Sequence, residues 1–433
     1  MSVRQLAERA RHAGAGLAAL DGGARSALLR DVAGALGDPT QRARLLAANA
    51  EDRSRAEGEA ARGELSPALL PRLALDGEKL DGLADGLRQL AGKPELVNQV
   101  TLRRELDDGL VLTRVTSPLG LVGVVFESRP DAVLQICGLA IKSGNAVLLK
   151  GGREATCSNR ALVALLHESL ERHGVDPAAI GLLADRAEFA DMLALDDLVD
   201  VVVARGSTAF VVHTREHTRI PVMGHAEGLC HLYLHRAAEP AMAARIAVDA
   251  KCGYPAACNS IETLLWDEGA EAALDAAVAA LRAAGVELRA CAATLQRHPE
   301  LGAASEDDWD REYGALALAL RRVAGLDAAL AHIAAHGSRH TEAIVTADAA
   351  AARRFLAAVD AAGVFHNAST RFADGYRYGL GAEVGISTGK LHARGPVGIE
   401  GLLTYRWLLQ GEGQVAGDYG PGGRRFSHRD LLP

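Results

Sequence analysis

Apolar residues recur every three or four positions through most of the first hundred residues, as at Leu28, Val32 and Leu36. This spacing places them on one face of a helix, so the segment is predicted to be mainly helical, with breaks at glycine and proline. The pattern changes over 101–116, where two short segments flank an Asp-Asp-Gly sequence. Because Asp-Gly favours a tight turn, we expect a β-hairpin there, which suits an arm that contacts another subunit.

From Pro118 onward, continuous apolar runs of strand length alternate with segments of helical spacing. The runs "GLVGVVFES", "NAVLLKGG" and "LVDVVVARGS" are separated by such segments. Apolar strands without polar alternation are typical of a parallel sheet that helices cover on both faces. The pattern therefore predicts a first α/β domain.

The alternation restarts after Gly228 with the apolar runs "CHLYLH", "IETLLWD", "EAIVTAD" and "GVFHNAS". Helical spacing at 241–251, 270–284 and 326–336 lies between them. A second parallel-sheet domain with its own core is the simplest interpretation. The last segment, 411–433, is rich in glycine and charge, so we expect a poorly ordered tail.

The composition supports large aliphatic cores and excludes some classes of partner. The chain has 433 residues, of which 49% are hydrophobic and only 4% aromatic, which is enough for two or three domains. A net charge of −8 without a long basic run argues against nucleic acid or an anionic membrane as the main partner. No apolar stretch reaches the length of a membrane span. Six irregularly spaced cysteines favour reduced thiols in a cytoplasmic enzyme.

One cysteine stands out by its position. Cys258 lies in "PAACNSIETLL", on a polar loop of small residues directly before an apolar run of strand length. Backbone amides near it can stabilise an oxyanion, and its thiolate is a strong nucleophile once its pKa is lowered. Asn259 can orient reacting groups by hydrogen bonding. The local sequence also fits a small buried cysteine without a chemical role, and it leaves both interpretations open.

A zinc site is the competing interpretation for the cysteines and histidines of the same region, namely His225, Cys230, His231, Cys252 and Cys258. No C-x-x-C pair occurs among them, and their spacing matches no standard structural zinc site. We therefore expect no metal.

The nucleotide-binding signals are local and do not form a complete motif. No G-x-G-x-x-G follows the first strand of the α/β region. Lys150, in "LLKGGREA", ends a predicted strand, where a ribose or phosphate binds in parallel sheets. Gly206, Ser207 and Thr208 form a later strand-to-helix turn that suits a pyrophosphate at a helix N-terminus. Each feature alone also fits an ordinary loop with a solvated lysine.

Taken together, these segments resemble a known family. The stretch "SPLGLVGVVFESRPDAVLQICGLAIKSGNAVLLKGGREA", the "ARGST" turn, the cysteine loop and the late "GLGAEVGISTGKLHARGPVGIEGLLTYRW" occur in the order of the aldehyde dehydrogenase superfamily. Within it, "KCGYPAACNSIETLL", "IPVMGHAEGLCHLYL", "HGSRHTEAIVT" and "NASTRF" resemble the γ-glutamyl phosphate reductases. The resemblance extends from about Leu36 to Trp407.

The resemblance implies an α/β fold of the aldehyde dehydrogenase type, with two Rossmann-like parallel-sheet domains and a small β oligomerisation arm. It places an NADP-binding domain at 1–100 and 117–227 and a catalytic domain at 228–388. The arm would comprise 101–116 and 389–410, followed by the tail already described. It also implies a homo-oligomer. Contact with glutamate 5-kinase, which would supply the labile acyl phosphate, is a further partner that the resemblance suggests.

The resemblance further implies that NADPH reduces L-glutamate 5-phosphate to L-glutamate 5-semialdehyde in proline biosynthesis, with release of phosphate. Cys258 matches the family nucleophile, whose thiolate would displace phosphate and form a thioester. Hydride transfer to that thioester and collapse of the thiohemiacetal would then release the aldehyde.

Four residues match positions that hold the cofactor in the superfamily. Lys150 corresponds to the lysine at the adenine ribose, and its charge also suits a 2′-phosphate. Gly206 and Ser207 correspond to the turn under the pyrophosphate. Glu312, in "REYGALALAL", falls within one residue of the acid that holds the nicotinamide ribose.

Three arginines in family motifs are candidates for binding the α-carboxylate or the phosphate of the substrate: Arg129, Arg371 and Arg394. A guanidinium binds either anion through paired N–H groups. A structural ion pair is an equally good interpretation for each of them. The resemblance does not decide which arginine binds which anion.

Two departures concern the hydrolytic members of the superfamily. Glu227, in "PVMGHAEGLCH", is offset from the place of their water-activating glutamate, and "FESRPD" lacks their oxyanion asparagine. A reductase with phosphate as leaving group needs no such water, so the Cys258 amide and Asn259 are the expected oxyanion donors. The alternatives are a hydrolytic aldehyde dehydrogenase and a catalytically inactive scaffold. The joint presence of Cys258, Lys150 and the late arginines argues against the scaffold.

Overall fold

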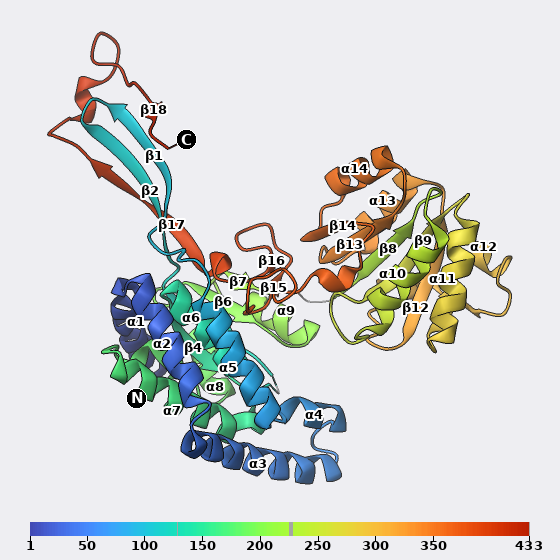
Figure 1. Cartoon of the computed structure of the whole chain (residues 1–433), viewed down its shortest axis with the longest axis horizontal. Helices are drawn as coiled ribbons and strands as arrows, with labels where there is room; N and C mark the ends of the chain where they lie inside the picture. The colour runs from blue at the N-terminus through green and yellow to red at the C-terminus, as the bar shows by residue number, and fades with distance from the viewer. Residues whose placement is uncertain (128, 225–227, 433) are drawn as a thin grey trace.

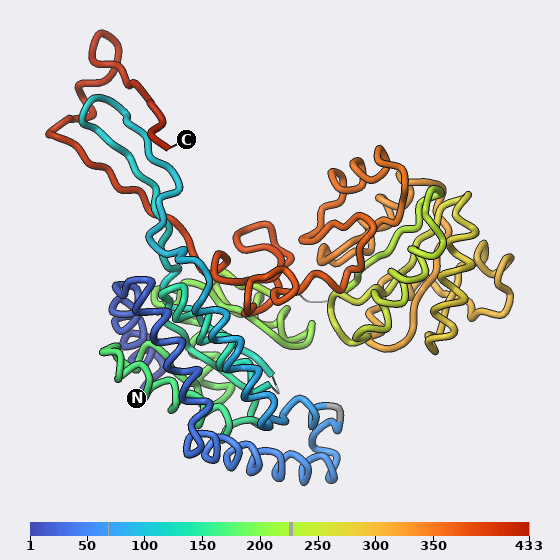
Figure 2. The backbone as a smooth tube through the Cα atoms, in the orientation of Figure 1, coloured from blue at the N-terminus to red at the C-terminus, as the bar shows by residue number. Residues whose placement is uncertain are grey.

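The computed structural model describes residues 1–127, 129–224 and 228–432, which form two α/β domains and an extended arm. Figure 1 shows the two domains apart from each other, each with its own sheet and helices, while the arm projects from the first domain. The tube in Figure 2 shows that the chain leaves the second domain and returns to the first before it enters the arm. The predicted class of two parallel sheets plus a small β arm is confirmed.

The N-terminal region is helical, as its apolar spacing predicts. Its helices are α1 (Val3–Ala19), α2 (Gly22–Ala35), α3 (Pro39–Ala61), α4 (Leu70–Leu73) and α5 (Gly77–Ala91). Three of them begin directly after an aspartate, because the carboxylates of Asp21, Asp38 and Asp76 accept backbone N–H bonds of the first turn. Apolar faces of α2 and α5 then pack on a helix of the first α/β domain, α6 (Ala132–Ser143).

The first sheet has the strand order β5-β4-β3-β6-β7, and all of its strands are parallel. Its strands are β3 (Leu121–Val125), β4 (Ala146–Lys150), β5 (Ile180–Leu182), β6 (Val201–Ala204) and β7 (Val222–Met223). The crossover helices are α6, α7 (Thr156–Arg172), α8 (Arg186–Leu193) and α9 (Thr208–Glu216). The strands β3, β4 and β6 are buried along their whole length, as a doubly covered sheet requires.

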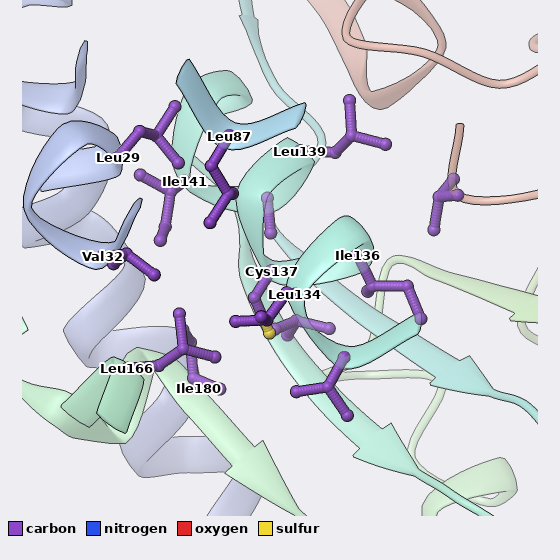
Figure 3. Close-up of a cluster of buried hydrophobic side chains, with 14 of the residues drawn as sticks. Leu29, Val32, Leu87, Leu134, Ile136, Cys137, Leu139, Ile141, Leu166 and Ile180 are labelled. Atoms are coloured by element: carbon purple, nitrogen blue, oxygen red, sulfur yellow. The ribbon is translucent and has the colours of Figure 1, made fainter. Parts of the chain in front are cut away.

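The core of this domain is aliphatic. Figure 3 shows leucine, isoleucine and valine side chains from several helices meeting beside the sheet, with the Cys137 sulfur among them. Cys137 is fully buried, and burial raises the pKa of its thiol well above the ordinary range. It therefore acts as a small apolar residue, as its place in a helical pattern suggests.

The second sheet is also parallel, with the order β11-β10-β12-β9-β8-β13-β14. Its strands are β8 (Cys230–Leu234), β9 (Ile261–Asp267), β10 (Glu287–Ala290), β11 (Gly302–Ala303), β12 (Ala317–Val323), β13 (Thr341–Val345) and β14 (Gly363–His366). The helices are α10 (Pro240–Cys252), α11 (Glu271–Ala283), α12 (Ala292–Leu295), α13 (Leu326–His336) and α14 (Ala349–Ala358). The four strands predicted for this domain are confirmed as β8, β9, β13 and β14. Among them, β9 is the buried strand that follows the cysteine loop.

After β14 the chain packs on the first domain again. A short pair, β15 (Ile386–Ser387) and β16 (Gly395–Pro396), crosses between the domains, and Val384, Val397 and Ile399 join the aliphatic core of the first domain. This change of packing partner precedes residue 388, where the sequence suggested that the catalytic domain ends.

The arm is an antiparallel sheet of order β17-β2-β1-β18. It contains the predicted hairpin of β1 (Val100–Asp107) and β2 (Leu110–Pro118), joined by β17 (Leu403–Gln410) and β18 (Arg429–Asp430). The expectation of a poorly ordered tail is wrong, because β18 pairs with β1. Ion pairs Arg104–Asp430, Arg429–Glu105 and Arg424–Asp107 anchor the tail along that strand.

Among the residues that the structure describes, no helix is long and apolar enough to cross a membrane. All six cysteines are free thiols. No set of three or more metal-ligating side chains gathers anywhere in the described ranges. His225 of the alternative zinc set and Glu227 lie outside those ranges.

Candidate active site

Cys258 lies on the turn that joins α10 to β9. Backbone bonds from Ala257 to Tyr254 (3.1 Å) and from Ser260 to Ala257 (2.8 Å) shape this turn and place Cys258, a half-buried residue, at the mouth of the strand. The Cys230 Sγ donates a hydrogen bond to the Cys258 carbonyl at 3.3 Å. A Cβ on Gly228 would lie 2.5 Å from the Cys258 Cα, so only glycine permits the close approach of these two loops.

Burial and two neighbouring carboxylates favour the protonated form of the Cys258 thiol. Burial is the main cause that raises its pKa, to about 12, and the carboxylates of Glu383 and Glu312 add to this effect. The guanidinium of Arg371 opposes it. The thiol is therefore enclosed by charged groups from both domains and from the returning segment after β14.

We expect alkylation of Cys258 by iodoacetamide to be slow at pH 7 and to accelerate as the pH rises, because only the thiolate reacts. Because the Glu383 carboxylate raises this pKa, the Glu383→Gln variant should be alkylated faster at pH 8. Mass spectrometry of the peptide that contains Cys258 separates it from the other five thiols. Fast alkylation at pH 7 without pH dependence would contradict this electrostatic account.

Asn259 connects the cysteine loop to the segment after β14. Its Nδ2 donates to the Ala373 carbonyl at 2.9 Å, and its Oδ1 accepts a hydrogen bond from Arg371 Nη1. Asn259 is 4% exposed, so these bonds hold a buried amide in one orientation. The structure thus brings Cys258, Asn259 and Arg371 together, and one amide N–H of the expected oxyanion donor is engaged with Ala373.

Arg371 is partly buried beside this turn. Burial lowers its pKa, and the nearby Arg377 acts in the same direction. Its guanidinium lies 6.0 Å from the centre of the Tyr254 ring. Arg394 differs, because it forms an ion pair with Asp360 at 2.9 Å. That pair involves Nη1 only, and Nε and Nη2 of Arg394 are buried without a hydrogen-bond partner among the described residues, so both interpretations of Arg394 stay open.

Two charged residues that the sequence analysis missed lie beside the nucleophile, Arg205 and Glu383. Arg205 directly follows β6, and burial lowers its pKa. Its Nη1 atom is buried and has no hydrogen-bond partner among the described residues. Burial raises the pKa of Glu383, although its Oε2 accepts the Gly375 N–H at 2.8 Å and Arg205 lies nearby. The sequence signal was present, because these residues occur in "ARGST" and "GLGAEVG", two of the family motifs.

A cavity of about 320 Å³ adjoins this cluster. Arg205, Glu383, Arg129 and Asp374 supply its charged lining, together with residues of α5 and α6. Leu87 and Leu134, both visible in Figure 3, supply part of its apolar lining. Of the three predicted substrate arginines, Arg129 lines this cavity, and Arg371 and Arg394 do not.

The predicted cofactor residues of the first domain share the carboxyl edge of its sheet. Lys150 ends β4, and its Nζ bonds to the Gly151 carbonyl. Burial lowers the pKa of Lys150, while Glu154 and Asp185 partly offset this effect. A cavity of about 80 Å³ lies beyond β4 and β5, lined by Gly151, Gly152, Thr156, Asn159, Arg160, Leu182, Leu183 and Ala184.

The turn after β6 contains Gly206 and Ser207, and Ser207 is the N-cap of α9. Its side chain forms no capping hydrogen bond, which leaves the helix N-terminus suited to a phosphate. Glu312 lies on the loop before β12 in the second domain, and its carboxylate acts on Cys258 and on Lys251. Lys150, Gly206 and Ser207 therefore lie at the edge of the first sheet, and Glu312 lies in the second domain.

Comparison with known proteins identifies close relatives. No family model matches the chain. A γ-glutamyl phosphate reductase from Synechococcus sp. (strain JA-3-3Ab) is 56% identical over 391 residues, which cover 90% of this chain and 86% of that protein. The crystal structure of γ-glutamyl phosphate reductase from Thermotoga maritima superposes with a TM-score of 0.91 at 34% identity, over 96% of this chain and 100% of that one.

A more distant structure shows the wider fold. An acetylating aldehyde dehydrogenase from Geobacillus thermoglucosidasius superposes with a TM-score of 0.64 at 17% identity, over 95% of this chain and 97% of that one. At such low sequence identity, the comparison shows only that the two proteins share a fold. The aldehyde-dehydrogenase-like architecture expected from the sequence is therefore confirmed.

Proposed function

Because the chain belongs to the γ-glutamyl phosphate reductase family, we propose that it reduces L-glutamate 5-phosphate to L-glutamate 5-semialdehyde and phosphate, with NADPH as the reductant, in proline biosynthesis. The observation that carries this proposal is the thiol of Cys258, which lies on a constrained turn among Arg371, Glu383 and Glu312. An acyl phosphate is an activated carboxyl group, so a positioned thiolate suffices to displace its phosphate.

Cys258 is the proposed nucleophile. Its proton passes to water, and the positive charge of Arg371 favours the resulting thiolate. The sulfur attacks the acyl carbon, the bond from that carbon to the phosphate oxygen breaks, and phosphate departs with the electron pair. The cofactor supplies the hydride that reduces the resulting thioester carbonyl. When the carbon–sulfur bond then breaks, the aldehyde is released and the thiolate is restored.

The cofactor would be held by Lys150, Gly206, Ser207 and Glu312. Lys150 would bind the ribose and 2′-phosphate end, the turn at Gly206 and Ser207 would bind the pyrophosphate, and Glu312 would bind the nicotinamide ribose. Arg371 is the proposed partner of the phosphate or of the developing oxyanion. Of the three predicted arginines, it is the one named among the main charges that act on the pKa of Cys258, and it lowers that pKa.

We expect a preference for NADPH over NADH to which Lys150 contributes. Because a 2′-phosphate gains a charge-assisted hydrogen bond from a lysine, Lys150→Ala should raise the Michaelis constant for NADPH about 10-fold and that for NADH much less. Steady-state kinetics with both cofactors measure the effect. An equal rise for both would place Lys150 at the shared ribose only.

The reverse reaction tests the proposed function as a whole. Purified enzyme supplied with glutamate 5-semialdehyde, phosphate and NADP should form NADPH, and omission of phosphate should stop steady turnover. A protein without such turnover would be the inactive scaffold, and phosphate-independent turnover would indicate a hydrolytic dehydrogenase.

Self-association through the arm stays a prediction. One edge of the arm sheet is β17, where Tyr405, Trp407, Leu408 and Leu409 are exposed. An exposed apolar edge strand is suited to pairing with a second copy.

A further inference from the structure

The cavity beside Cys258 contains both signs of charge. Arg205 and Arg129 contribute guanidinium groups, while Glu383 and Asp374 contribute carboxylates. The Asp374 carboxylate already accepts the backbone N–H groups of Tyr376 and Arg377 at 3.0 and 3.1 Å. Arg205 and Glu383 are the less satisfied pair, because Arg205 Nη1 is buried without a partner among the described residues and Glu383 Oε2 accepts one backbone N–H.

Burying such groups without full compensation is unfavourable, so an occupant of complementary charge would stabilise them. Both residues also lie close enough to Cys258 for their charges to interact with its sulfur. The cavity also adjoins the cysteine loop in space, because Asn259 Nδ2 bonds to the carbonyl of Ala373, the neighbour of the lining residue Asp374. The required occupant carries one cation and one anion close together and an uncharged link toward Cys258.

We propose that the cavity binds the α-amino-acid end of the substrate, with Glu383 receiving the α-ammonium group and Arg205, supported by Arg129, receiving the α-carboxylate. This assignment rests on the proposed reductase function and names the residues that select its substrate. In the glutamyl chain two methylene groups separate the α-carbon from the acyl carbon. The apolar lining from Leu87 and Leu134 suits those methylenes, and the acyl carbon is left for Cys258.

The assignment predicts discrimination between aldehydes that differ only at the α-carbon. Removing a charge-assisted hydrogen bond at a buried site leaves the protein group unpaired, which reduces kcat/KM by about 100-fold. Wild-type enzyme should therefore favour glutamate 5-semialdehyde over 5-oxopentanoate, which lacks the amino group. It should likewise disfavour 4-aminobutanal, which lacks the carboxylate.

The test measures kcat/KM for these aldehydes with NADP and phosphate. Glu383→Gln should reduce about 100-fold the ratio of kcat/KM for glutamate 5-semialdehyde to kcat/KM for 5-oxopentanoate. Arg205→Met should remove the discrimination against 4-aminobutanal in the same way. Because Glu383→Gln also changes the pKa of Cys258, the ratio between two aldehydes is the readout, since a change at the thiol affects both alike. Glu400→Gln, an exposed carboxylate of the same C-terminal segment, is the matched control.

Each outcome decides the assignment. Loss of the amino-group preference in Glu383→Gln and of the carboxylate preference in Arg205→Met supports it. Equal losses for all aldehydes, or unchanged ratios in variants that still turn over, would overturn the cavity assignment and leave the reductase function intact. A wild-type enzyme that shows no phosphate-dependent oxidation of glutamate 5-semialdehyde would overturn the proposed function, and the cavity assignment with it.

Discussion

Replacement of Cys258 with alanine is expected to reduce turnover at least about 1000-fold while folding and cofactor binding stay intact, because no other group can form the acyl intermediate. Cys258→Ser should be nearly as inactive, since a neutral hydroxyl is a far weaker nucleophile than a thiolate. The NADPH-dependent reduction of the acyl phosphate measures activity, and quenching of protein fluorescence by NADPH measures binding.

Cys252→Ala is the matched control for this prediction. Cys252 ends α10, six positions before the nucleophile, and packs beside the aliphatic core of the second domain. Burial raises the pKa of its thiol as well, so the two cysteines differ mainly in their position relative to the other site residues. The Cys252 variant should keep most of the activity. An essential Cys252 with a dispensable Cys258 would show that the wrong thiol has been assigned.

The residues that could be predicted from the sequence occupy fixed places in local elements. Cys258 precedes a buried strand, Lys150 ends one, and Gly206 begins a strand-to-helix turn. Each position follows from apolar runs and turn chemistry, which are properties of short segments. The parallel sheets follow in the same way, because strands buried on both faces carry no polar alternation.

The charged lining of the cavity could not be predicted in this way. Arg205 and Glu383 are 178 positions apart in the numbering, and they meet only because the segment after β14 returns to the first domain. A charged residue within a glycine-rich motif has no periodic signal, and its burial depends on that long-range contact. The ion pair of Arg394 with Asp360 could not be predicted for the same reason, because Asp360 follows α14 and is distant from Arg394 in the sequence.

The tail shows why composition alone misled. Glycine and charge at 411–433 indicate disorder in an isolated segment. Here the edge of β1 is available for pairing, and the charges of the tail find opposite charges on that strand, as in the pair of Arg104 and Asp430. Several such ion pairs are individually weak, so the backbone pairing of β18 is the main reason that the tail follows the arm.

The oxidative reaction is expected to stop after one turnover when phosphate is absent. Glutamate 5-semialdehyde and NADP should acylate Cys258 and produce one NADPH per active site. Without a base that activates water, the thioester should then persist, because thiol esters hydrolyse slowly unless water is deprotonated. Rapid mixing followed at the NADPH absorbance should show a burst and little afterwards, and acid quenching followed by intact-mass measurement should show the acyl group on the protein.

Addition of phosphate should restore steady turnover, because phosphate attacks the thioester and regenerates the thiolate. Glu227→Gln provides the discriminating variant, since Glu227 is the carboxylate nearest in sequence to the place of the hydrolytic base. If the enzyme is a reductase, this variant should keep both the burst and the phosphate-dependent rate. Sustained NADPH formation without phosphate that disappears in Glu227→Gln would instead identify a hydrolytic dehydrogenase. In that case Cys258 would retain its role as nucleophile, but water would replace phosphate as the group that releases the acyl chain.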